Sequence, residues 1–325
     1  MRTHPEPPRH VPLVHVTRGA IVESVHHGSV VAIDASGRSA LVHGDAATPV
    51  YPRSSLKPLQ ATAMVRAGLD LPPRLLALAG ASHSGAAMHR EGARAILAIH
   101  GVPEEALRNA VDLPLGAAER EAWLREGGER TRIAQNCSGK HAAMLATCAV
   151  NGWDLEGYLL PQHPLQLAIR VAVAELSSEE PDASTADGCG TPLWAISLAG
   201  LARAFARIVS SPEGTPERRV ADAMRAHPDM VGGDGRDVTD LMLHVPGLLA
   251  KDGAEGVYAA ALPDGRAVAL KIADGSERAR LPVLLDALAS LGVDASGVQR
   301  PAPVLGGGQP VGELLLAPSA TRPVR

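Results

Sequence analysis

Residues 21–45 read IVESVHHGSVVAID, then the turn ASGR, then SALVHGD. Apolar residues rich in Val and Ile on either side of a Gly-containing turn are typical of a β-hairpin. A second segment of this kind, VYAAAL-PDGR-AVALKI, spans residues 257–272 near the other end of the chain. Because an isolated hairpin is only marginally stable, we expect the two ends of the chain to meet in one mixed or antiparallel sheet.

The middle of the chain has a different pattern. From residue 56 to residue 208, Ala- and Leu-rich stretches repeat with helical spacing. His163-Pro164 precedes LQLAIRVAVAEL, and Thr191-Pro192 precedes LWAISLAGLARAFARIV. Both pairs predict a helix start, with Thr191 as an N-cap and Pro192 at the first helical position. From residue 301 onward the chain is rich in Pro and Gly, which predicts an irregular or frayed tail.

Together these patterns predict a fold of the α/β class in its α+β form, with a sheet formed by both termini, flanking helices and a helical middle. We expect a single unit over residues 1–325. Its sheet lobe is predicted to comprise about residues 10–52 and 245–300, and its helical part about residues 54–240.

The composition excludes several kinds of partner. Aromatic residues make up only 2% of the chain, and 31 Lys and Arg stand against 35 Asp and Glu. With neither base-stacking platforms nor a basic excess, we expect no nucleic-acid partner. The N-terminal residues contain no apolar signal region, and no run of about 18 apolar residues occurs. Three cysteines cannot form a disulfide framework. We therefore expect a cytoplasmic protein with no membrane segment.

The segment Ser54-Ser55-Leu56-Lys57 lies where a loop ends and the apolar helix LKPLQATAMVRAGL begins. Because residues i and i+3 share a helix face, the Ser54 hydroxyl and the Lys57 amine are expected to lie one turn apart. Beside Arg53 and the positive end of the helix, a buried Lys57 would have a lowered pKa and could deprotonate Ser54. Ser-x-x-Lys indicates acyl transfer, as in penicillin-recognising enzymes, although alone it is more common at solvated helix starts.

Two further polar positions interrupt apolar runs. Residues 81–85 (ASHSG) follow LLALAGA, so the Ser82 hydroxyl either faces a site or belongs to a turn that caps the next helix. Lys271 lies inside the apolar strand AVALKI. A strand lysine is most often solvent-exposed, but a buried one would be a second amine with a lowered pKa.

Cysteine occurs in two polar turns. Residues 136–141 (NCSGKH) place an amide, a thiol, a hydroxyl, an amine and an imidazole before the helix HAAMLATCAV, whose free N–H groups could receive an oxyanion or carboxylate. Residues 187–190 (DGCG) form a tight turn with a second thiol. Two cysteines alone do not specify zinc, which takes four ligands. The third cysteine, Cys148, lies on an apolar helix face and is predicted to be core.

Taken in order, these segments resemble the L-asparaginases of the Rhizobium etli inducible type, the zinc-containing Ser-Lys branch of the asparaginase II family. The segments that carry the resemblance are IVESVH, RSSLKPLQA, ASHSG, NCSGKHAAML, QHPLQ, DGCGTP, HPDMVGG and VALKIADG. An ordered series over nearly the whole chain is more specific than any single motif. The resemblance implies a fold similar to serine β-lactamases and glutaminases, a homodimer, and hydrolysis of L-asparagine to L-aspartate and ammonia.

The resemblance also implies roles for individual residues. The catalytic set consists of two Ser-Lys pairs, Ser54 with Lys57 and Ser82 with Lys271. A zinc ion is expected at Cys137, Lys140 and Cys189. Substrate binding is expected from Arg53, His83, Asn136, Ser138, His141 and Asp187. Two positions depart from the family pattern, because Ala86 stands where glutamate is frequent and Ala143 where glycine is common.

On this hypothesis, Lys57 takes the proton of Ser54, whose oxygen attacks the side-chain amide and forms a β-aspartyl ester that water hydrolyses. The sequence does not decide which of the two serines attacks the amide, so their roles could be interchanged. Zinc would shape the site rather than generate hydroxide, because a serine nucleophile is available. Two alternatives stay open: another Ser-x-x-Lys hydrolase acting on glutamine, a β-lactam or a peptidoglycan amide, and a non-catalytic protein that binds an amino acid.

Overall fold

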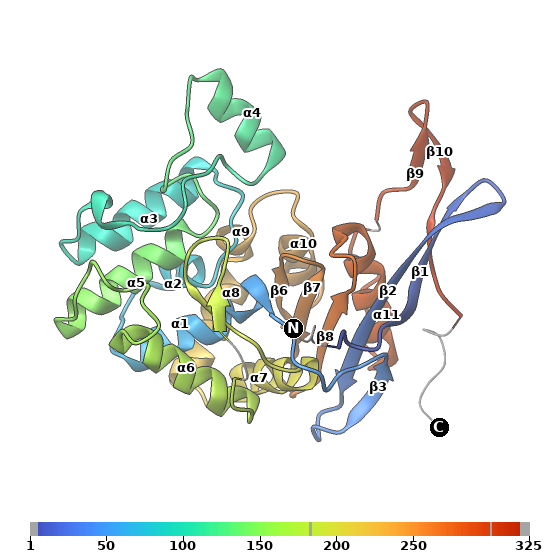
Figure 1. Cartoon of the computed structure of the whole chain (residues 1–325), viewed down its shortest axis with the longest axis horizontal. Helices are drawn as coiled ribbons and strands as arrows, with labels where there is room; N and C mark the ends of the chain where they lie inside the picture. The colour runs from blue at the N-terminus through green and yellow to red at the C-terminus, as the bar shows by residue number, and fades with distance from the viewer. Residues whose placement is uncertain (1–5, 182–183, 300, 319–325) are drawn as a thin grey trace, which may run out of the picture.

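The computed structural model describes residues 6–181, 184–299 and 301–318. The main sheet lies on the right of Figure 1 and most of the helices lie on the left. The chain starts in the sheet, crosses into the helical half after β3, and returns to the sheet at β6. The predicted arrangement, a sheet contributed by both ends of the chain around a helical middle, is confirmed.

The main sheet is antiparallel and has the order β11-β1-β2-β8-β7-β6, with β3 paired to the C-terminal end of β2. The hairpins β2–β3 and β7–β8 are the two that the sequence predicts, and the pairing of β2 with β8 joins them. The strands are β1 Val11–Arg18, β2 Ile21–Ile33, β3 Ser39–His43, β6 Leu249–Gly253, β7 Val257–Ala261, β8 Ala267–Ile272 and β11 Leu314–Leu316.

The helices of the middle region pack on one another, whereas α7 and α11 pack against the sheet. The α-helices are α1 Lys57–Arg66, α2 Pro73–Ala79, α3 Ala87–Ile99, α4 Ala117–Arg125, α5 Ser138–Asn151, α6 Pro164–Ser177, α7 Leu198–Ser210, α8 Pro216–Ala226, α9 Pro228–Val231, α10 Asp237–His244 and α11 Arg280–Ser290. Short 3₁₀ turns lie at η1 Arg53–Leu56, η2 Glu104–Ala106 and η3 Glu277–Ala279. The sheet and these helices share one core of Ala, Leu, Val and Ile.

One predicted helix start is confirmed and the other is wrong. The ring of His163 accepts a hydrogen bond from the Leu165 N–H, and α6 begins at Pro164. Thr191 caps no helix, because the next residues form β5 (Pro192–Trp194), which pairs with β4 (Ser184–Ala186). The helix α7 begins later, at Leu198, with Ser197 as its N-cap. The Thr191 hydroxyl accepts instead from Lys140 at 2.9 Å, so a tertiary contact overrides the local signal.

The predicted frayed tail is wrong over residues 301–318. The strands β9 (Val304–Gly306) and β10 (Gln309–Gly312) form a hairpin, and β11 pairs with β1. The Ala317 N–H also donates to the Leu13 carbonyl at 2.8 Å. Backbone pairing along β1 therefore orders a segment whose composition favours no regular structure.

The core contains few aromatic side chains, as the composition requires. The single phenylalanine, Phe205, is fully buried, as are Tyr158 and Tyr258. The predicted core position of Cys148 is confirmed, because it is 0% exposed. Within the described ranges, no helix has both the length and the apolar character that crossing a membrane requires.

Candidate active site

The segment 53–57 turns from the 3₁₀ helix η1 directly into α1, as the Ser-x-x-Lys pattern predicts. Arg53, which opens it, has a φ of 52°, a left-handed conformation that is uncommon outside glycine and is often retained at functional sites. Ser54 is 8% exposed and Lys57 only 1%. The two side chains are therefore withdrawn from bulk water at the start of an apolar helix.

The amine of Lys57 lies at the centre of the site. It donates to the Ser82 hydroxyl at 2.9 Å, to the Ala81 carbonyl at 2.5 Å and to the Cys137 sulfur at 3.1 Å. The Ser54 hydroxyl has no hydrogen-bond partner within the described part of the chain and is slightly accessible. Ser82 comes from the turn after α2, which is the site-facing alternative of the two predicted for it, since α3 begins only at Ala87.

Lys271 does not pair with Ser82 in the structure. Its Nζ donates to the backbone carbonyl oxygens of Glu255 and Ile272, and its side chain is half-buried. Burial lowers its pKa. Among the described residues, the Lys57 amine is hydrogen-bonded to the Ser82 hydroxyl. Neither predicted pair, Ser54 with Lys57 or Ser82 with Lys271, is joined by a hydrogen bond.

The structure contains a second buried amine that was not predicted from the sequence, on a strand that packs against η1. Lys251 in β6 is 0% exposed, and its carbonyl oxygen accepts a hydrogen bond from the Ser55 hydroxyl at 3.0 Å. Burial lowers the pKa of Lys251 to about 8, although its ion pair with Asp252 opposes this. The chain has four lysines and 27 arginines. Three of the four lysines, Lys57, Lys140 and Lys251, are fully buried near this site. Because lysine is so rare in this chain, each lysine in the sequence could have been taken as a candidate site residue, including Lys251.

The cysteines of the two polar turns meet beside Lys57. Cys137 and Cys189 are hydrogen-bonded to each other, which raises the pKa of Cys137 and lowers that of Cys189. Lys140 donates to the Cys189 sulfur at 3.2 Å. Burial acts to lower the pKa of Lys140, but the two sulfurs raise it overall. The two sulfurs therefore lie between the side-chain nitrogens of Lys57 and Lys140.

Arg53 and Asp187 lie at the outer edge of this cluster. The Arg53 Nε donates to the Asp187 carboxylate at 2.8 Å, and the carboxylate also accepts from the Gly188 N–H at 2.8 Å. The Arg53 side chain is 24% exposed and that of Asp187 is 10%. Arg53 and Asp187, both predicted to bind substrate, therefore form an ion pair in which their charges offset each other.

The remaining residues predicted to bind substrate lie deeper. His83, Ser138 and His141 are all 0% exposed, and the His83 Nε2 is 3.0 Å from the Ser138 hydroxyl. Burial lowers the pKa of both histidines, which favours their neutral forms. Asn136 accepts from the His83 N–H through its backbone oxygen at 3.2 Å. These residues therefore adjoin the Cys137 segment.

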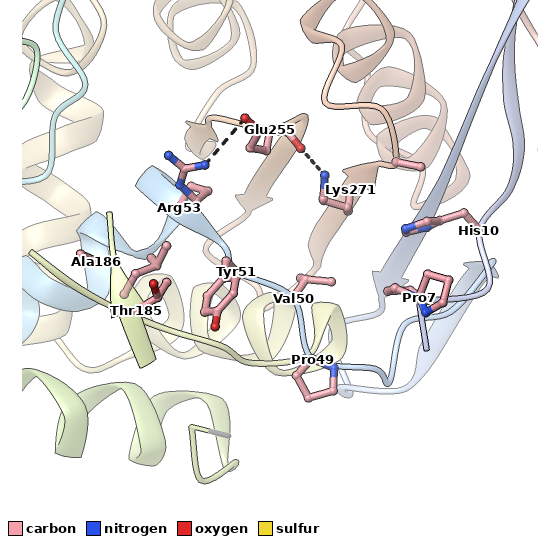
Figure 2. Close-up of a pocket in the computed structure, with 13 residues that line it drawn as sticks. Pro7, His10, Pro49, Val50, Tyr51, Arg53, Thr185, Ala186, Glu255 and Lys271 are labelled. Atoms are coloured by element: carbon pink, nitrogen blue, oxygen red, sulfur yellow. Dashed lines mark hydrogen bonds and ion pairs between the residues drawn. The ribbon is translucent and has the colours of Figure 1, made fainter. Parts of the chain in front are cut away.

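A pocket of about 620 Å³ opens beside Arg53. Figure 2 shows Arg53, Glu255 and Lys271 side by side along one wall, with His10 farther along and Tyr51 and Pro49 opposite. Arg53 and Lys271 are the predicted site residues that line it. Arg53 lines the pocket and directly precedes Ser54, so it connects the pocket to the reactive cluster. We use this name for Ser54, Lys57, Ser82, Cys137, Lys140 and Cys189.

The sequence model of the family described as L-asparaginase II matches residues 14–315. The chain belongs to the L-asparaginase II family. It is therefore a hydrolase that acts on amides. No curated protein sequence matches the chain.

Two of the solved structures similar to this family member are described as β-lactamases. A putative β-lactamase from Bacteroides dorei DSM 17855 is 16% identical, with a TM-score of 0.45, over 81% of this chain and 93% of that one. A β-lactamase from Mycobacterium bovis is 16% identical, with a TM-score of 0.39, over 84% of this chain and 95% of that one.

The resemblance to the Rhizobium etli inducible type implies a zinc ion, so we compared the side chains around Cys137 and Cys189 with the ligands that zinc takes. Among the described residues, no group of three or more His, Cys, Asp or Glu side chains could hold a metal ion. A third donor is available in the Lys140 amine, which contacts Cys189. The His141 imidazole also lies beside Cys189, with which its side chain interacts. Two thiols, an amine and an imidazole form a donor set that fits Zn²⁺.

Proposed function

We propose that the chain hydrolyses L-asparagine to L-aspartate and ammonia through an acyl-enzyme, and that within its family it is of the Rhizobium etli inducible type. The observation that carries this proposal is the buried Lys57 amine, 2.9 Å from one serine hydroxyl and three residues from another. A hydroxyl beside an amine that can accept its proton is the arrangement that acyl transfer requires. Membership of the L-asparaginase II family supports the choice of substrate.

In the proposed reaction, the neutral Lys57 amine takes the proton of Ser54, and the Ser54 oxygen attacks the side-chain amide carbon. Ser54 is the attacking serine because it is the more accessible of the two and has no competing hydrogen bond. The leaving amide nitrogen needs a proton, and Ser82, hydrogen-bonded to Lys57, can pass that proton on. Water then hydrolyses the ester, with Lys57 again accepting a proton.

Selection of a free amino acid requires a cation for its α-carboxylate and an anion for its α-ammonium group. We assign these roles to Arg53 and Asp187, which form an ion pair 2.8 Å long at the edge of the cluster. A zwitterionic substrate would replace each partner of this pair by an equivalent charge. An uncharged amide would break the ion pair without compensation, which disfavours such substrates.

The test of the proposed function is ammonia release from L-asparagine by the wild type, Ser54→Ala and Ser82→Ala. The wild type should release ammonia. Ser54→Ala should lose about 1,000-fold or more in kcat, because no acyl-enzyme can form. Ser82→Ala should lose about 100-fold, because only the proton relay is removed. If Ser82→Ala formed no acyl-enzyme while Ser54→Ala still released ammonia, the roles of the two serines would be the reverse of those proposed.

Two further substrates distinguish the alternatives. L-Glutamine is to be compared with L-asparagine by ammonia release, and the chromogenic β-lactam nitrocefin is to be followed by its change in absorbance at the same concentration. Turnover of either one in preference to L-asparagine would contradict the substrate assignment but keep the amide hydrolase. Binding of L-asparagine by calorimetry without ammonia release would instead favour an amino-acid-binding protein. A homodimer and a cytoplasmic location stay predictions from the resemblance and the sequence.

We also propose that Cys137, Cys189 and Lys140 hold Zn²⁺. The bound ion would supply a fixed positive charge beside the substrate. Two thiols in contact, one of them with a lowered pKa, are suited to deprotonation by a metal. Lys140 would have to bind as the neutral amine, which a nearby dication favours.

The purified protein is expected to contain about one zinc per chain by elemental mass spectrometry, as structural zinc sites do. Cys189→Ser should lose the metal, because it removes the thiolate that contacts Lys140. Cys148→Ser is the matched control, since Cys148 is also buried but lies on the apolar face of α5. Zinc retained in Cys189→Ser, or absent from wild type reconstituted with ZnCl₂, would rule out the site.

A further inference from the structure

The pocket beside Arg53 extends well beyond the one residue that the proposed hydrolysis uses. It encloses about 620 Å³, within the range of about 300–1,000 Å³ that small-molecule sites occupy. Of the described residues that line it, Arg53 alone takes part in the proposed reaction. The rest of the pocket has no assigned function, although polar side chains and an apolar wall meet in it (Figure 2).

Most of the pocket wall is apolar. Three stretches far apart in the sequence supply it: the segment before β1, the segment leading into η1, and the short strand β5. The residues that they contribute are Pro7, Pro8, Pro49, Val50 and Leu193. Three of these five are prolines, which have no backbone N–H to offer a polar ligand. This wall is therefore suited to a hydrocarbon group, whose burial is favourable.

The polar end of the pocket is the Lys271 amine, on β8. Its Nζ donates to the backbone carbonyl oxygens of Glu255 and Ile272. A lysine ammonium has three N–H donors, so one remains available to a ligand. Among the described residues, no carboxylate forms an ion pair with this amine. Burial lowers the pKa of Lys271, and a ligand carboxylate in contact would offset this effect by favouring the charged amine.

Glu255 lies between Lys271 and Arg53 on the same wall (Figure 2). Its backbone carbonyl accepts from Lys271, and its carboxylate is 3.9 Å from the Arg53 Nη1. Arg53 and Glu255 both have a left-handed backbone, with φ of 52° and 59°. Outside glycine such a conformation costs free energy, and it is often retained where a ligand is bound. This wall therefore has the features of a binding site, and it connects Lys271 with the reactive cluster.

The charges of the wall favour a ligand with a single negative charge. The described charged side chains are those of Lys271, Arg53 and Glu255, two cations and one anion, so one positive charge remains. His10 adds none at neutral pH, because burial and the Lys271 charge lower its pKa. A phosphate monoester would exceed this charge and would bring three acceptor oxygens to a site with few donors. A carboxylate matches both the charge and the remaining N–H of Lys271.

We propose that this pocket binds an apolar monocarboxylate, a ligand outside the proposed hydrolysis. The carboxylate contacts the Lys271 amine, and the hydrocarbon chain lies along Pro49, Val50 and Leu193. Because a partly exposed ion pair alone contributes little, the apolar wall supplies most of the affinity. Lys271 supplies the preference for an anion over a neutral molecule of the same shape.

The experiment is isothermal titration calorimetry of the purified protein with sodium octanoate, and with 1-octanol as the uncharged probe. The wild type should bind octanoate about 10-fold more tightly than 1-octanol, because only the carboxylate pairs with the Lys271 amine. Hexanoate should bind about 10-fold more weakly than octanoate, since it buries two fewer CH₂ groups.

Two variants test whether Lys271 is the source of the preference. Lys271→Met retains an apolar stem of similar length but no amine, so it should bind octanoate and 1-octanol about equally. Its affinity for 1-octanol should stay that of the wild type. Arg38→Met is the matched control, because Arg38 is an exposed cation in the turn after β2, beyond the opposite end of β8. This control should keep the preference for octanoate.

A preference for octanoate that persists in Lys271→Met would overturn the proposal. So would a wild type that binds neither probe, or binds both equally, and this result decides the matter even if Lys271→Met does not fold. Loss of the preference in Arg38→Met would also overturn it, because the preference would then reflect the overall charge of the sheet.

A ligand in this pocket should also affect hydrolysis, and this part rests on the proposed function. Arg53 lines the pocket and forms an ion pair with Asp187 at 2.8 Å. A second negative charge beside Arg53 would compete with the α-carboxylate of L-asparagine. Saturating octanoate should therefore raise KM about 5-fold or more with kcat unchanged. An unchanged KM would overturn this part. If the wild type hydrolyses no L-asparagine, the proposed function fails, but calorimetry still decides the binding.

Discussion

Lys57→Met is expected to lower kcat for ammonia release from L-asparagine by about 1,000-fold or more. Methionine matches the lysine stem in length and fills the same buried space, so the backbone of α1 need not move. It removes the amine that donates to Ser82 and Cys137 and that would accept the proton of Ser54. Steady-state ammonia release and circular dichroism on the same sample provide the measurement.

Lys271→Met is the matched comparison, because it removes the other lysine of the predicted catalytic set. Its Nζ is engaged by two backbone carbonyls at the wall of the pocket, so we expect a loss of less than about 10-fold. Equal losses in the two variants would contradict the pairing of Lys57 with Ser82 and restore Lys271 to the reaction. A fully active Lys57→Met would contradict the Ser-Lys mechanism altogether.

The sequence predicts those parts of the fold that local patterns determine. The hairpins β2–β3 and β7–β8 follow from apolar runs on either side of Gly-containing turns, and their pairing follows from the marginal stability of an isolated hairpin. The N-cap at His163 is likewise local, since its ring accepts from a backbone N–H two residues away. Such signals need no information about distant residues.

Where tertiary contacts decide, the same reasoning fails. Thr191 has the residue type and the following proline of a helix N-cap, but its hydroxyl binds Lys140, 51 residues away. The segment after residue 301 is ordered by pairing with β1 at the opposite end of the chain. Neither partner can be identified from the neighbouring sequence, so both local predictions are wrong.

The sequence indicates which residues lie near one another in the candidate site better than it indicates which of them are hydrogen-bonded to each other. Ser54, Lys57, Ser82, Cys137, Lys140 and Cys189 lie in turns and helix starts that the sequence marks as polar interruptions, and the structure brings them together. The order of the motifs along the chain does not determine the directions of their side chains. It therefore cannot show which amine contacts which hydroxyl. Lys251 was missed because Lys-Asp-Gly resembles a solvated turn, whereas the structure buries it as the end of a strand.

Gly139→Ala is expected to lower both stability and activity, through the contact of α5 with α2. A Cβ at this position would lie 2.4 Å from the Leu78 Cγ and 2.8 Å from the Leu78 carbonyl oxygen. Alanine favours a helix over glycine by about 1 kcal/mol, but overpacking against a backbone atom costs about 1–3 kcal/mol. The clash should prevail, because the carbonyl oxygen cannot rotate away as a flexible side chain can. The free energy of unfolding from urea titration measures the difference.

The same displacement should reach the reactive cluster. Gly139 lies between Ser138 and Lys140 in the first turn of α5, and Cys137 immediately precedes that turn. Moving this turn away from α2 would separate Cys137 from Lys57, and a misplacement of about 1 Å is expected to lower kcat about 100-fold. Gly297→Ala is the control, because its Cβ would meet nothing closer than 3.4 Å. Gly297→Ala should preserve both the free energy of unfolding and kcat. If Gly139→Ala were as stable and as active as this control, α5 would tolerate displacement without disturbing the site.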